Sequence, residues 1–405
     1  MGWSSFRKTG LTYKDSRSAG GYTLVTPIGG DWVLLIDEMG RVVQRWKPAG
    51  IRPGYGFLLP GGHLLLRGQP EATADIRYGE PGGGPDVLME LDWEGRVFWR
   101  WEHSGFHHDM ARMPNGHTLV PVWEQCPAEI ADRVKGGIPP ETAARYLADT
   151  AYMQFILLGA GVGGRPRDLS GFLSDALLEI SPNGQVIKTW HAYEHLDPDA
   201  DAICPLEFRR EWTHVNSIEF TPAGEVIVCC REPSLILRID WASGRLVSKW
   251  GQGIVSHPHH CSLTPEGNLL VFDNGCHHPI MPRSRVIEVD MRTGAIIWHY
   301  YPRQVFSFFS GHIAGAERLW NGNTLVCEGQ SGRVFEVTAE GEVCWEWINP
   351  FELPFKGVLS SMLFRAHRYR NDGPELAGRP LNPESRKDPD ARRPASSAQP
   401  TRAEA

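Results

Sequence analysis

The segment SPNGQVIKTW (181–190) joins a glycine-centred turn to a short apolar strand that ends in an aromatic residue. Asn, Asp and Gly suit this turn because the chain needs positive φ and a local side-chain hydrogen bond there, and the β-branched residues that follow favour a strand. The pattern occurs six times, as DEMGRVVQRW (37–46), DWEGRVFWRW (92–101), SPNGQVIKTW (181–190), DWASGRLVSKW (240–250), DMRTGAIIWHY (290–300) and TAEGEVCWEW (338–347). Each copy is predicted to be the last hairpin of one repeating sheet.

A second glycine-centred hairpin precedes five of these six copies. Its copies are LLPGGHLLL (58–66), RMPNGHTLV (112–120), FTPAGEVIV (220–228), LTPEGNLLV (263–271) and RLWNGNTLV (318–326). A repeat of roughly 45 to 60 residues with four short strands is typical of a propeller blade, because such a sheet buries its faces only against neighbouring copies. The predicted fold class is therefore all-β, a six-bladed β-propeller.

The sixth blade has no first hairpin of its own in the sequence. LFRAHRY (363–369) supplies a candidate inner strand, and GYTLVTP (21–27) supplies the strand that leads into the first repeat. Pairing these segments would close the last blade with the N-terminal strands and remove the open edges that a linear stack of sheets would keep. Residues 1–370 are thus expected to form one domain, and residues 371–405, rich in Pro, Ser, Arg and Asp, a disordered tail.

Two long connections interrupt the repeat. Residues 125–172 fall between strands of the second blade, and ETAARYLADTAYMQFILL (141–158) within them has helical spacing. This spacing predicts a small helical insertion that caps one mouth of the central channel. Residues 191–211 form the other connection, which is rich in acidic and aromatic side chains.

Composition limits the partners and the location that are expected. The formal charge of −7, with both signs interspersed, provides no field that would attract nucleic acid. The N-terminus lacks the apolar core of a signal peptide, and no apolar run approaches a membrane span, so a soluble cytoplasmic protein without a membrane partner is expected. The eight cysteines form no CxxC pair and are predicted to be reduced. Nothing in the sequence indicates the oligomeric state.

Histidines recur just before the first hairpins, and the strand register predicts their direction. Residues an even number apart on a strand face the same side. Five side chains lie six or eight positions before the turn residue of their hairpin (Pro114, Pro222, Pro265 or Trp320), namely His108, His214, Asn216, His259 and His312. These five are expected to share the face that lines the axial channel. His107 and His260 lie at odd offsets and are expected to act only through their neighbours.

The number of histidines favours a functional interpretation. A single histidine in a strand is more often a hydrogen-bonded core residue. Four at matching positions are different, because imidazoles crowded in a narrow channel repel one another on protonation and add little packing. Arg231, which follows the strand VIVCC (226–230), is expected near the same channel as an anchor for an anion. FDNG (272–275) is interpreted as a tight turn without a catalytic role.

Several of these segments resemble the bacterial arylsulfate sulfotransferase family, a group of six-bladed propellers. They are HHDMARMPNG (107–116), EWTHVNSIEFTPAG (211–224), SHPHHCSLTPEGNLLVFDNG (256–275) and SGHIAGAERLWNGNTLVCEGQSGRVFEVTAEGEVCWEW (310–347). The resemblance covers roughly residues 10 to 370. Family members of known activity transfer a sulfuryl group from one phenolic ester to another phenol without a nucleotide sulfate donor, through a transiently sulfurylated histidine.

The resemblance implies a role for each matching residue. His259 matches the nucleophile, and Arg231 matches the arginine of the anion site. His108, His214 and Asn216 match residues that line this site. His312 matches no catalytic position of the family and is expected, like Arg231, to contact the substrate. The implied enzyme is an arylsulfotransferase-like transferase that acts on a small aromatic molecule and needs no cofactor.

A metal-dependent enzyme is the alternative hypothesis. In it, three or four of His108, His214, His259 and His312 bind one divalent transition metal, zinc or iron, because neutral imidazole is the commonest ligand for these ions. The protein would then be a lyase, hydrolase or oxygenase, with Asp109 as the only carboxylate assignable as a partner of a ligand. A third hypothesis is a propeller that binds a partner on its rim, although such a scaffold does not need four imidazoles in its channel.

Overall fold

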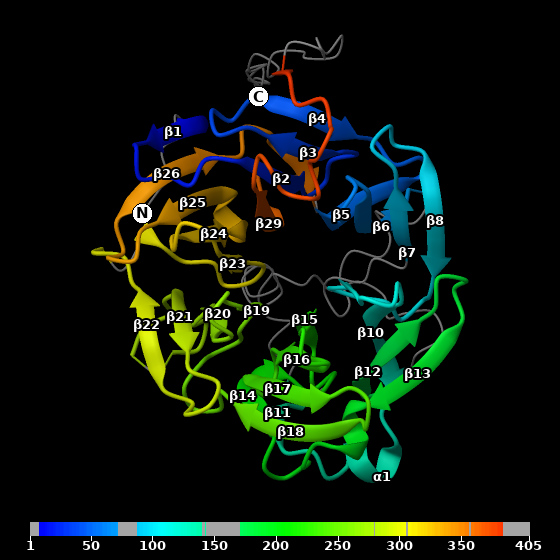
Figure 1. The fold of residues 1–405 in the computed structure, drawn as a ribbon. Helices are drawn as coiled ribbons and strands as arrows, with labels where there is room; N and C mark the ends of the chain where they lie inside the picture. Colours follow the sequence, from blue (N-terminus) through cyan, green and yellow to red (C-terminus); the bar gives the residue numbers. More distant parts are fainter. Residues whose placement is uncertain are drawn as a thin grey trace, which may run out of the picture.

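The computed structural model describes residues 8–71, 87–139, 142, 171–278, 280–304, 307–355 and 358–383. Six antiparallel sheets, five with four strands and one with five, stand around a common axis like the blades of a propeller (Figure 1). The prediction of an all-β, six-bladed β-propeller is confirmed.

Three blades follow one another along the chain from residue 51. Blade 1 contains β5 (Ile51–Leu58), β6 (Leu64–Pro70), β7 (Val87–Leu91) and β8 (Val97–Glu102). Blade 2 contains β9 (Ala111–Arg112), β10 (Thr118–Gln125), β12 (Leu173–Ile180) and β13 (Val186–His191). Blade 3 contains β15 (Val215–Phe220), β16 (Glu225–Cys230), β17 (Leu235–Asp240) and β18 (Arg245–Trp250). In each blade the two hairpins seen in the sequence supply the four strands.

Two further blades and a composite one complete the ring. Blade 4 contains β19 (His260–Leu263), β20 (Leu269–Asp273), β21 (Arg285–Val289) and β22 (Ile296–Tyr300). Blade 5 contains β23 (Gly315–Arg318), β24 (Thr324–Glu328), β25 (Arg333–Val337) and β26 (Val343–Ile348). Blade 6 contains β29 (Leu363–Tyr369), β2 (Tyr22–Pro27), β3 (Val33–Ile36) and β4 (Val42–Trp46).

Two strand pairings tie the ends of the chain together. In blade 6, β29 pairs with β2 in a register that places Tyr22 opposite Tyr369 and Val25 opposite Ala366. In blade 5, β1 (Gly10–Lys14) is the fifth strand and pairs with β26, a contact that the sequence did not predict. Backbone hydrogen bonds therefore bridge the ring at two neighbouring blades.

Part of the segment that was expected to be a disordered tail is ordered. The backbone N–H of Gly61 donates to the carbonyl oxygen of Pro374 at 2.9 Å. Leu376 is buried in the same apolar cluster as Trp93, and the guanidinium of Arg379 lies 5.7 Å from the centre of the Trp93 ring. Residues 371–383 pack here because they cover apolar surface of blade 1, and residues 384–405 lie outside the described residues.

The two long connections meet in a small parallel sheet. It pairs β11 (Gly136–Ile138), from the first connection, with β14 (Ile203–Phe208), from the second. The helical segment predicted within 141–158 lies outside the described residues, apart from Thr142. Short helical turns are α1 (Ala128–Ala131), η1 (Ala192–Glu194) and η3 (Gly329–Ser331), and β27 (Leu353–Phe355) pairs with β28 (Val358–Ser360). None of the helices in the described part of the chain has the length and apolar character needed to cross a membrane.

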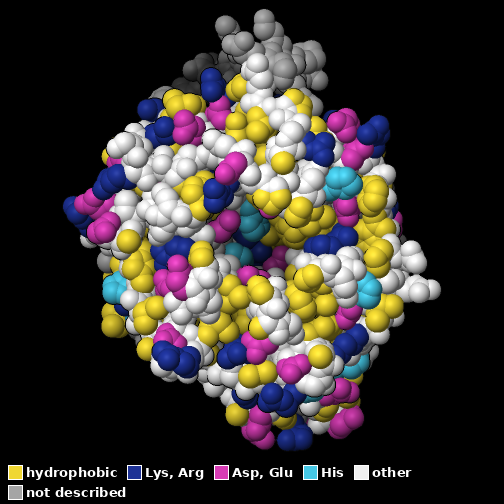
Figure 2. All heavy atoms as spheres, in the orientation of Figure 1, with side chains coloured by type: hydrophobic (Ala, Val, Ile, Leu, Met, Phe, Trp, Pro, Cys, Tyr) yellow, Lys and Arg dark blue, Asp and Glu magenta, His cyan; other side chains and the backbone are white. Residues whose placement is uncertain are grey.

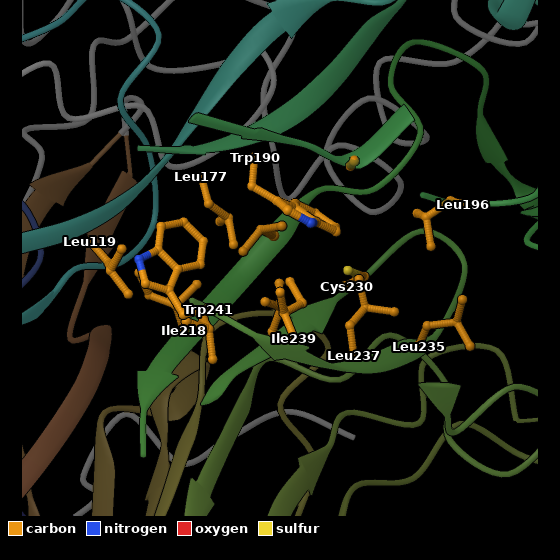
Figure 3. Packing of buried hydrophobic residues seen from close by; sticks show 14 of the residues in the cluster. Leu119, Leu177, Trp190, Leu196, Ile218, Cys230, Leu235, Leu237, Ile239 and Trp241 are labelled. Atoms are coloured by element: carbon orange, nitrogen blue, oxygen red, sulfur yellow. The ribbon is translucent and has the colours of Figure 1, made fainter. Parts of the chain in front are cut away.

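The hydrophobic core is divided among the interfaces between blades. Buried apolar side chains of the described residues form six clusters, and each contains residues of two adjacent blades. Between blades 2 and 3, Leu119 and Leu177 face Ile218 and Leu237 (Figure 3). Because a single blade cannot bury its own faces, the six sheets are expected to fold as one unit.

A tryptophan links five of the six last hairpins to the next blade. Its indole N–H donates to a backbone carbonyl oxygen in the glycine-centred turn of that blade. The tryptophan ends the repeat in blades 6, 2 and 3 and lies two residues before its end in blades 4 and 5. The pairs are Trp46 and Asp92 (3.1 Å), Trp190 and Gly244 (2.9 Å), Trp250 and Gly294 (3.0 Å), Trp298 and Ala339 (2.7 Å), and Trp345 and Glu38 (2.8 Å). The turn and the aromatic residue occur together in the repeat because they contact each other across blades.

Removing β29 should open the ring. A chain that ends at residue 362 loses the strand that buries Leu363 and Phe364, whose side chains together contribute about 3–6 kcal/mol through burial. It also exposes the edge of β2. A chain that ends at residue 383 keeps both features and is the control. In urea unfolding followed by tryptophan fluorescence, the shorter chain should unfold at a much lower midpoint, and equal midpoints would contradict closure by β29.

Candidate active site

A hollow opens on the axis of the propeller. Figure 2 shows histidine side chains in its wall, with acidic and basic side chains next to them. In blades 2 to 5, the chain enters the first strand of each blade close to this hollow (Figure 1). The residues described below lie on or near these entering segments.

Arg365, from β29, lies among the inner segments of four other blades and is almost fully buried. Its guanidinium donates to the Asp109 carboxylate at 2.9 Å and to the Tyr55 hydroxyl at 3.2 Å. It also donates to the backbone carbonyl oxygens of Asn216 and His259 at 3.3 and 3.4 Å. One buried cation therefore holds segments of blades 1, 2, 3 and 4 at fixed positions relative to the closing strand.

The stem of Arg365 and a set of side-chain hydrogen bonds complete this inner ring. Gly315 of blade 5 leaves room for the stem, since a Cβ atom there would lie 2.5 Å from Cγ of Arg365. At one equivalent position in three consecutive blades, a side chain accepts a hydrogen bond from a backbone N–H of the next blade. These bonds join Asp109 to Ile218 (3.0 Å), Ser217 to Cys261 (3.1 Å) and His260 to Ala316 (3.1 Å).

His108 and His214 face each other where blades 2 and 3 meet. Their Nε2 atoms are 3.2 Å apart and both side chains are buried. Nδ1 of His214 is 2.7 Å from Oε1 of Glu211, and Trp123 Nε1 donates to the other oxygen of Glu211 at 2.9 Å. A carboxylate beside Nδ1 requires a proton on that nitrogen, so His214 presents Nε2 to His108.

His107 and Asp175 orient His108. Nε2 of His107 is 2.6 Å from Asp175, so this nitrogen carries a proton. Burial lowers the pKa of His107 although Asp175 opposes the shift, and the neutral ring accepts at Nδ1 from Nδ1–H of His108 at 2.9 Å. Burial and the charges of His214 and His107 lower the pKa of His108 well below its usual range. With Nδ1 of each ring in a hydrogen bond, the two Nε2 atoms face each other at 3.2 Å, a position where a donor or a cation would satisfy both lone pairs.

His259 has one defined hydrogen-bond partner and one available nitrogen. The side-chain nitrogen of Asn274 donates to the carbonyl oxygen of Ser310 at 2.7 Å, which leaves the amide oxygen of Asn274 3.2 Å from Nδ1 of His259. Since an amide oxygen only accepts, Nδ1 carries the proton and Nε2 keeps its lone pair. Burial, followed by the charges of Arg231 and His312, lowers the pKa of His259 well below its usual range, so the ring is neutral.

Arg231 lies between two carboxyl groups. It donates to Glu207 at 2.8 Å and to Glu232 at 2.5 Å. Burial opposes the charge of Arg231, but the two carboxyl groups raise its pKa well above the usual range. Burial and the nearby Glu207 raise the pKa of Glu232 well above its usual range. Burial also acts to raise the pKa of Glu207, but the charge of Arg231 outweighs it and lowers that pKa, so Glu207 is the main counter-ion of Arg231.

Several residues at the entry to the inner strands have a left-handed backbone. His108, His214 and His257 have φ values of 52°, 49° and 56°, and Ile313 has a φ of 47° in blade 5. Non-glycine residues in this region are uncommon, cost about 1–3 kcal/mol each and often occur at functional sites. Here they turn the chain from the connection between blades into the first strand.

Comparison with known families found a match. The family model described as arylsulfotransferase (ASST) matches residues 154–350, which contain β12 and β13 of blade 2, all of blades 3 and 4, and β23 to β26 of blade 5. The match supports assignment of the chain to the arylsulfotransferase family. The six-bladed arrangement agrees with this assignment. No curated protein matches the chain.

A search of solved structures found several that are similar to this chain. A protein of unknown function from Bacteroides caccae has a TM-score of 0.50 and 13% identity, over 86% of this chain and 98% of that chain. A streptogramin B lyase has a TM-score of 0.44 and 8% identity, over 89% and 98% of the two chains. A virginiamycin B lyase from Staphylococcus aureus, with quinupristin, also has a TM-score of 0.44 and 8% identity, over 86% and 90%.

The structure brings most of the predicted site residues together. His108 contacts His214, and Arg365 contacts the backbone of Asn216 and His259. The side chain of Asn216 donates to the carbonyl oxygen of Pro258 at 2.9 Å and so supports the segment before His259. His312 is half-buried, and its charge acts on His259. Arg231 is also close enough to lower the pKa of His259, and it forms an ion pair with Glu207.

Strand alternation, from which these residues were predicted, explains their positions only in part. β9 begins at Ala111, β19 at His260 and β23 at Gly315, so His108, His259 and His312 precede the strands to which the alternation was applied. Strand alternation does not extend through residues with left-handed φ. The convergence depends on how these entering segments cross the inner ring, a feature of the tertiary structure.

Several residues near the site were not assigned to it from the sequence. His257 lies eight positions before Pro265, the same offset as His214, so the even-offset rule could have found it. Glu211 lies three residues before His214 and could also have been noticed. Asn274 belongs to FDNG, which was interpreted as a turn without a catalytic role. Its side chain also contacts His259, so Asn274 has a second role beside the turn.

No local sequence pattern indicated that Asp175 and Arg365 belong to the site, because their partners are distant in sequence. Arg365 is separated by 256 residues from Asp109, its ion-pair partner. This pair also corrects the expectation that Asp109 is the carboxylate available to a histidine ligand. That carboxylate binds Arg365 and a backbone N–H, and the carboxylates next to the imidazoles are Asp175 and Glu211.

Replacing Arg365 should destabilise the protein strongly. Arg365→Met leaves the Asp109 carboxylate buried without its cation, which costs about 3–5 kcal/mol. The double variant Arg365→Met with Asp109→Asn should recover part of this loss, because no unpaired charge remains. Free energies of unfolding in urea for the wild type, both single variants and the double variant measure the coupling. Strictly additive losses would contradict the ion pair.

Stability should fall as the pH falls below about 6.5. Burial lowers the pKa of each of five imidazoles, those of His107, His108, His257, His259 and His260. The unfolded chain therefore binds more protons than the folded chain below that pH, and each group contributes up to about 1.4 kcal/mol per pH unit. Urea unfolding between pH 7.5 and 5.5 measures the slope.

The control for this pH dependence is His260→Gln, because a glutamine oxygen can still accept from the N–H of Ala316. The variant should show a shallower loss of stability with acidification than the wild type. A free energy of unfolding that does not change over this pH range would exclude buried neutral imidazoles.

Proposed function

We propose that the protein transfers a sulfuryl group from an aryl sulfate ester to a phenol, and that Nε2 of His259 carries the group between the two steps. The observation that carries this proposal is the contact of His259 Nδ1 with Asn274, which leaves Nε2 as an unprotonated nitrogen. A neutral imidazole with a fixed tautomer is a competent nucleophile at neutral pH. The match to the arylsulfotransferase family model supports the reaction class.

The pair formed by His108 and His214 is the proposed acid and base. A proton held between the two Nε2 atoms satisfies both lone pairs in the resting protein. Donation of this proton to the departing phenolate oxygen lowers the barrier for leaving groups of high pKa. Glu211 accepts from Nδ1–H of His214 and so directs Nε2 toward His108.

The proposed reaction has two balanced steps. In the first, Nε2 of His259 forms a bond to sulfur while the sulfur–oxygen bond of the aryl ester breaks, and the phenolate takes the proton from the His108–His214 pair. In the second, the acceptor phenol returns a proton to the pair while its oxygen attacks sulfur and releases His259. Neither step requires an oxidant, a reductant or a cofactor.

Charged and polar groups near His259 can hold the sulfuryl oxygens. Arg231 has five N–H donors, and the two hydrogen bonds to Glu207 and Glu232 use only two of them. Asn216 uses its side-chain nitrogen for Pro258 and retains a second N–H. His312 is half-buried near His259. We therefore keep Arg231, Asn216 and His312 as the proposed binding residues.

Aromatic rings beside the imidazole pair suit an aryl substrate. The rings of Trp123 and Phe364 each lie 6.2 Å from the ring of His108, measured between centroids. Such rings stack with or pack edge-on against an aryl group.

The proposed location of the protein is the cytoplasm. The eight cysteines, which are all free thiols, support this location.

Replacement of His259 and replacement of His214 should affect the transfer rate differently as the leaving phenol is changed. His259→Gln should abolish transfer from every aryl sulfate, since no nitrogen remains to accept the sulfuryl group. His214→Gln should reduce the rate about 10²- to 10⁴-fold for an ester of unsubstituted phenol and much less for 4-nitrophenyl sulfate, whose phenolate needs little protonation. Release of the phenol, with a second phenol as acceptor, is the measurement.

His117→Gln is a matched control, because His117 pairs with Glu179 away from His259 and should leave the rate unchanged. Trapping of one sulfuryl group per chain by the wild type, but not by His259→Gln, would identify the intermediate. Normal turnover by His259→Gln would rule out His259 as the nucleophile.

A metal-dependent reaction remains the second candidate because of the same imidazole pair. Two nitrogen ligands of a tetrahedral zinc ion are about 3.3 Å apart, close to the 3.2 Å between the Nε2 atoms of His108 and His214. Ligand atoms of Glu211, His214 and Glu232 also lie within 4.8 Å of one another. Stoichiometric zinc or iron that is lost in His108→Gln, together with activity that a chelator removes, would favour this candidate over transfer through His259.

A further inference from the structure

A second cluster of potential metal ligands lies outside the residues used above. It consists of Cys204 on β14, His257 before blade 4, and His277 after β20, and one ligand atom from each lies within 4.8 Å of the others. Sγ of Cys204 is 3.2 Å from Nδ1 of His277. The rings of His257 and His277 lie 4.5 Å apart, at an interplanar angle of 82°. Thiolate and imidazole are ligands that zinc prefers.

His257 points independently to a bound ligand. Its side chain is completely buried, and in the described part of the chain neither ring nitrogen has a hydrogen-bond partner. An oxygen of Glu207 is 3.6 Å from Nδ1, beyond hydrogen-bond length. Buried polar atoms in proteins are almost always paired, so an imidazole with two unpaired nitrogens in this position calls for a ligand that accepts its lone pair.

The residues around His257 suit a metal better than an anion. The ring lies beside the thiol of Cys204 and the imidazole of His277, two groups that bind cations. Neutral imidazoles offer lone pairs to cations, and the Cys204 thiol can become a thiolate when a metal displaces its proton.

Backbone hydrogen bonds hold the three residues in place. The N–H of Cys204 donates to the carbonyl oxygen of Glu232 at 2.9 Å. The N–H groups of His257 and His277 donate to the hydroxyl oxygens of Ser234 and Ser256, at 3.1 and 3.0 Å respectively. A site whose ligands are already positioned loses little conformational freedom when it binds a metal.

We propose that Cys204, His257 and His277 bind one zinc ion, with Glu207 or a water molecule as the fourth ligand. On binding, the Cys204 thiol releases its proton to solvent and a sulfur–zinc bond replaces the contact between Sγ and Nδ1 of His277. The ion joins β14, on the connection 191–211, to the segment that leads into blade 4. This zinc site is structural and does not depend on the reaction proposed above.

The test uses the full chain, freed of metal with a chelator and then titrated with zinc chloride or cobalt chloride. One equivalent of zinc should bind, and cobalt should produce the near-ultraviolet charge-transfer band of a cobalt–thiolate bond. Cys204→Ser should remove the band and weaken zinc binding at least about tenfold. His277→Gln, a substitution at a half-buried residue, should weaken zinc binding similarly. Zinc should raise the Tm of the wild type but not of Cys204→Ser.

Three controls separate this site from other causes. Cys276→Ser removes the adjacent thiol, which donates to the carbonyl oxygen of Gly311, and should keep both the band and the zinc. His278→Gln changes the neighbouring imidazole and should also keep both. The metal-free Cys204→Ser protein should unfold at the same temperature as the metal-free wild type, which shows that the variant folds.

Two outcomes would overturn the proposal. The first is the absence of stoichiometric zinc binding and of the cobalt–thiolate band in the wild type. The second is zinc binding that persists in Cys204→Ser and His277→Gln but disappears in His214→Gln, which would assign the metal to the imidazole pair of blades 2 and 3. Because these measurements report binding and unfolding, they are independent of whether His259 carries a sulfuryl group.

Discussion

The buried guanidinium of Arg365 is the constraint on which the geometry of the site depends. It extends from the last strand of the ring and contacts inner segments of four other blades, including the backbone of Asn216 and His259. A guanidinium suits this position because its donors form a rigid, planar fork, and the charge is balanced by Asp109. Since Arg365 occupies β29, the strand pairing that closes the propeller also positions the segments that carry the chemistry.

The protonation of the central imidazoles follows from their second hydrogen-bond partners. Glu211 fixes Nδ1 of His214, Asp175 acts on His108 through His107, and Asn274 fixes Nδ1 of His259. Burial then keeps most of these rings neutral, because a charged imidazole loses its hydration. The result is one histidine with a free nitrogen beside a pair of facing histidines, the arrangement on which the proposed transfer through nitrogen rests.

The blades and the connections between them have separate tasks. The strands bury their faces against neighbouring blades and provide a rigid ring, while most of the polar site residues lie on the segments that enter the inner strands or on the connection 191–211. Functional residues are often found on such segments, because a rigid scaffold positions them without needing their side chains for its own packing. Left-handed residues such as His108 and His214 make these tight entries possible.

The sequence by itself determined the number of blades and which segments form each one, because the glycine turns and the aromatic residues that recur with them are local features that repeat. It also selected His108, His214 and His259, because they recur at similar distances from those turns. It did not determine how His108 meets His214, that Asn274 orients His259, or that Arg365 joins the blades. Those contacts link residues that are distant in sequence, most of them on different blades, and their distances exist only in the folded chain, so the tertiary structure alone decided them.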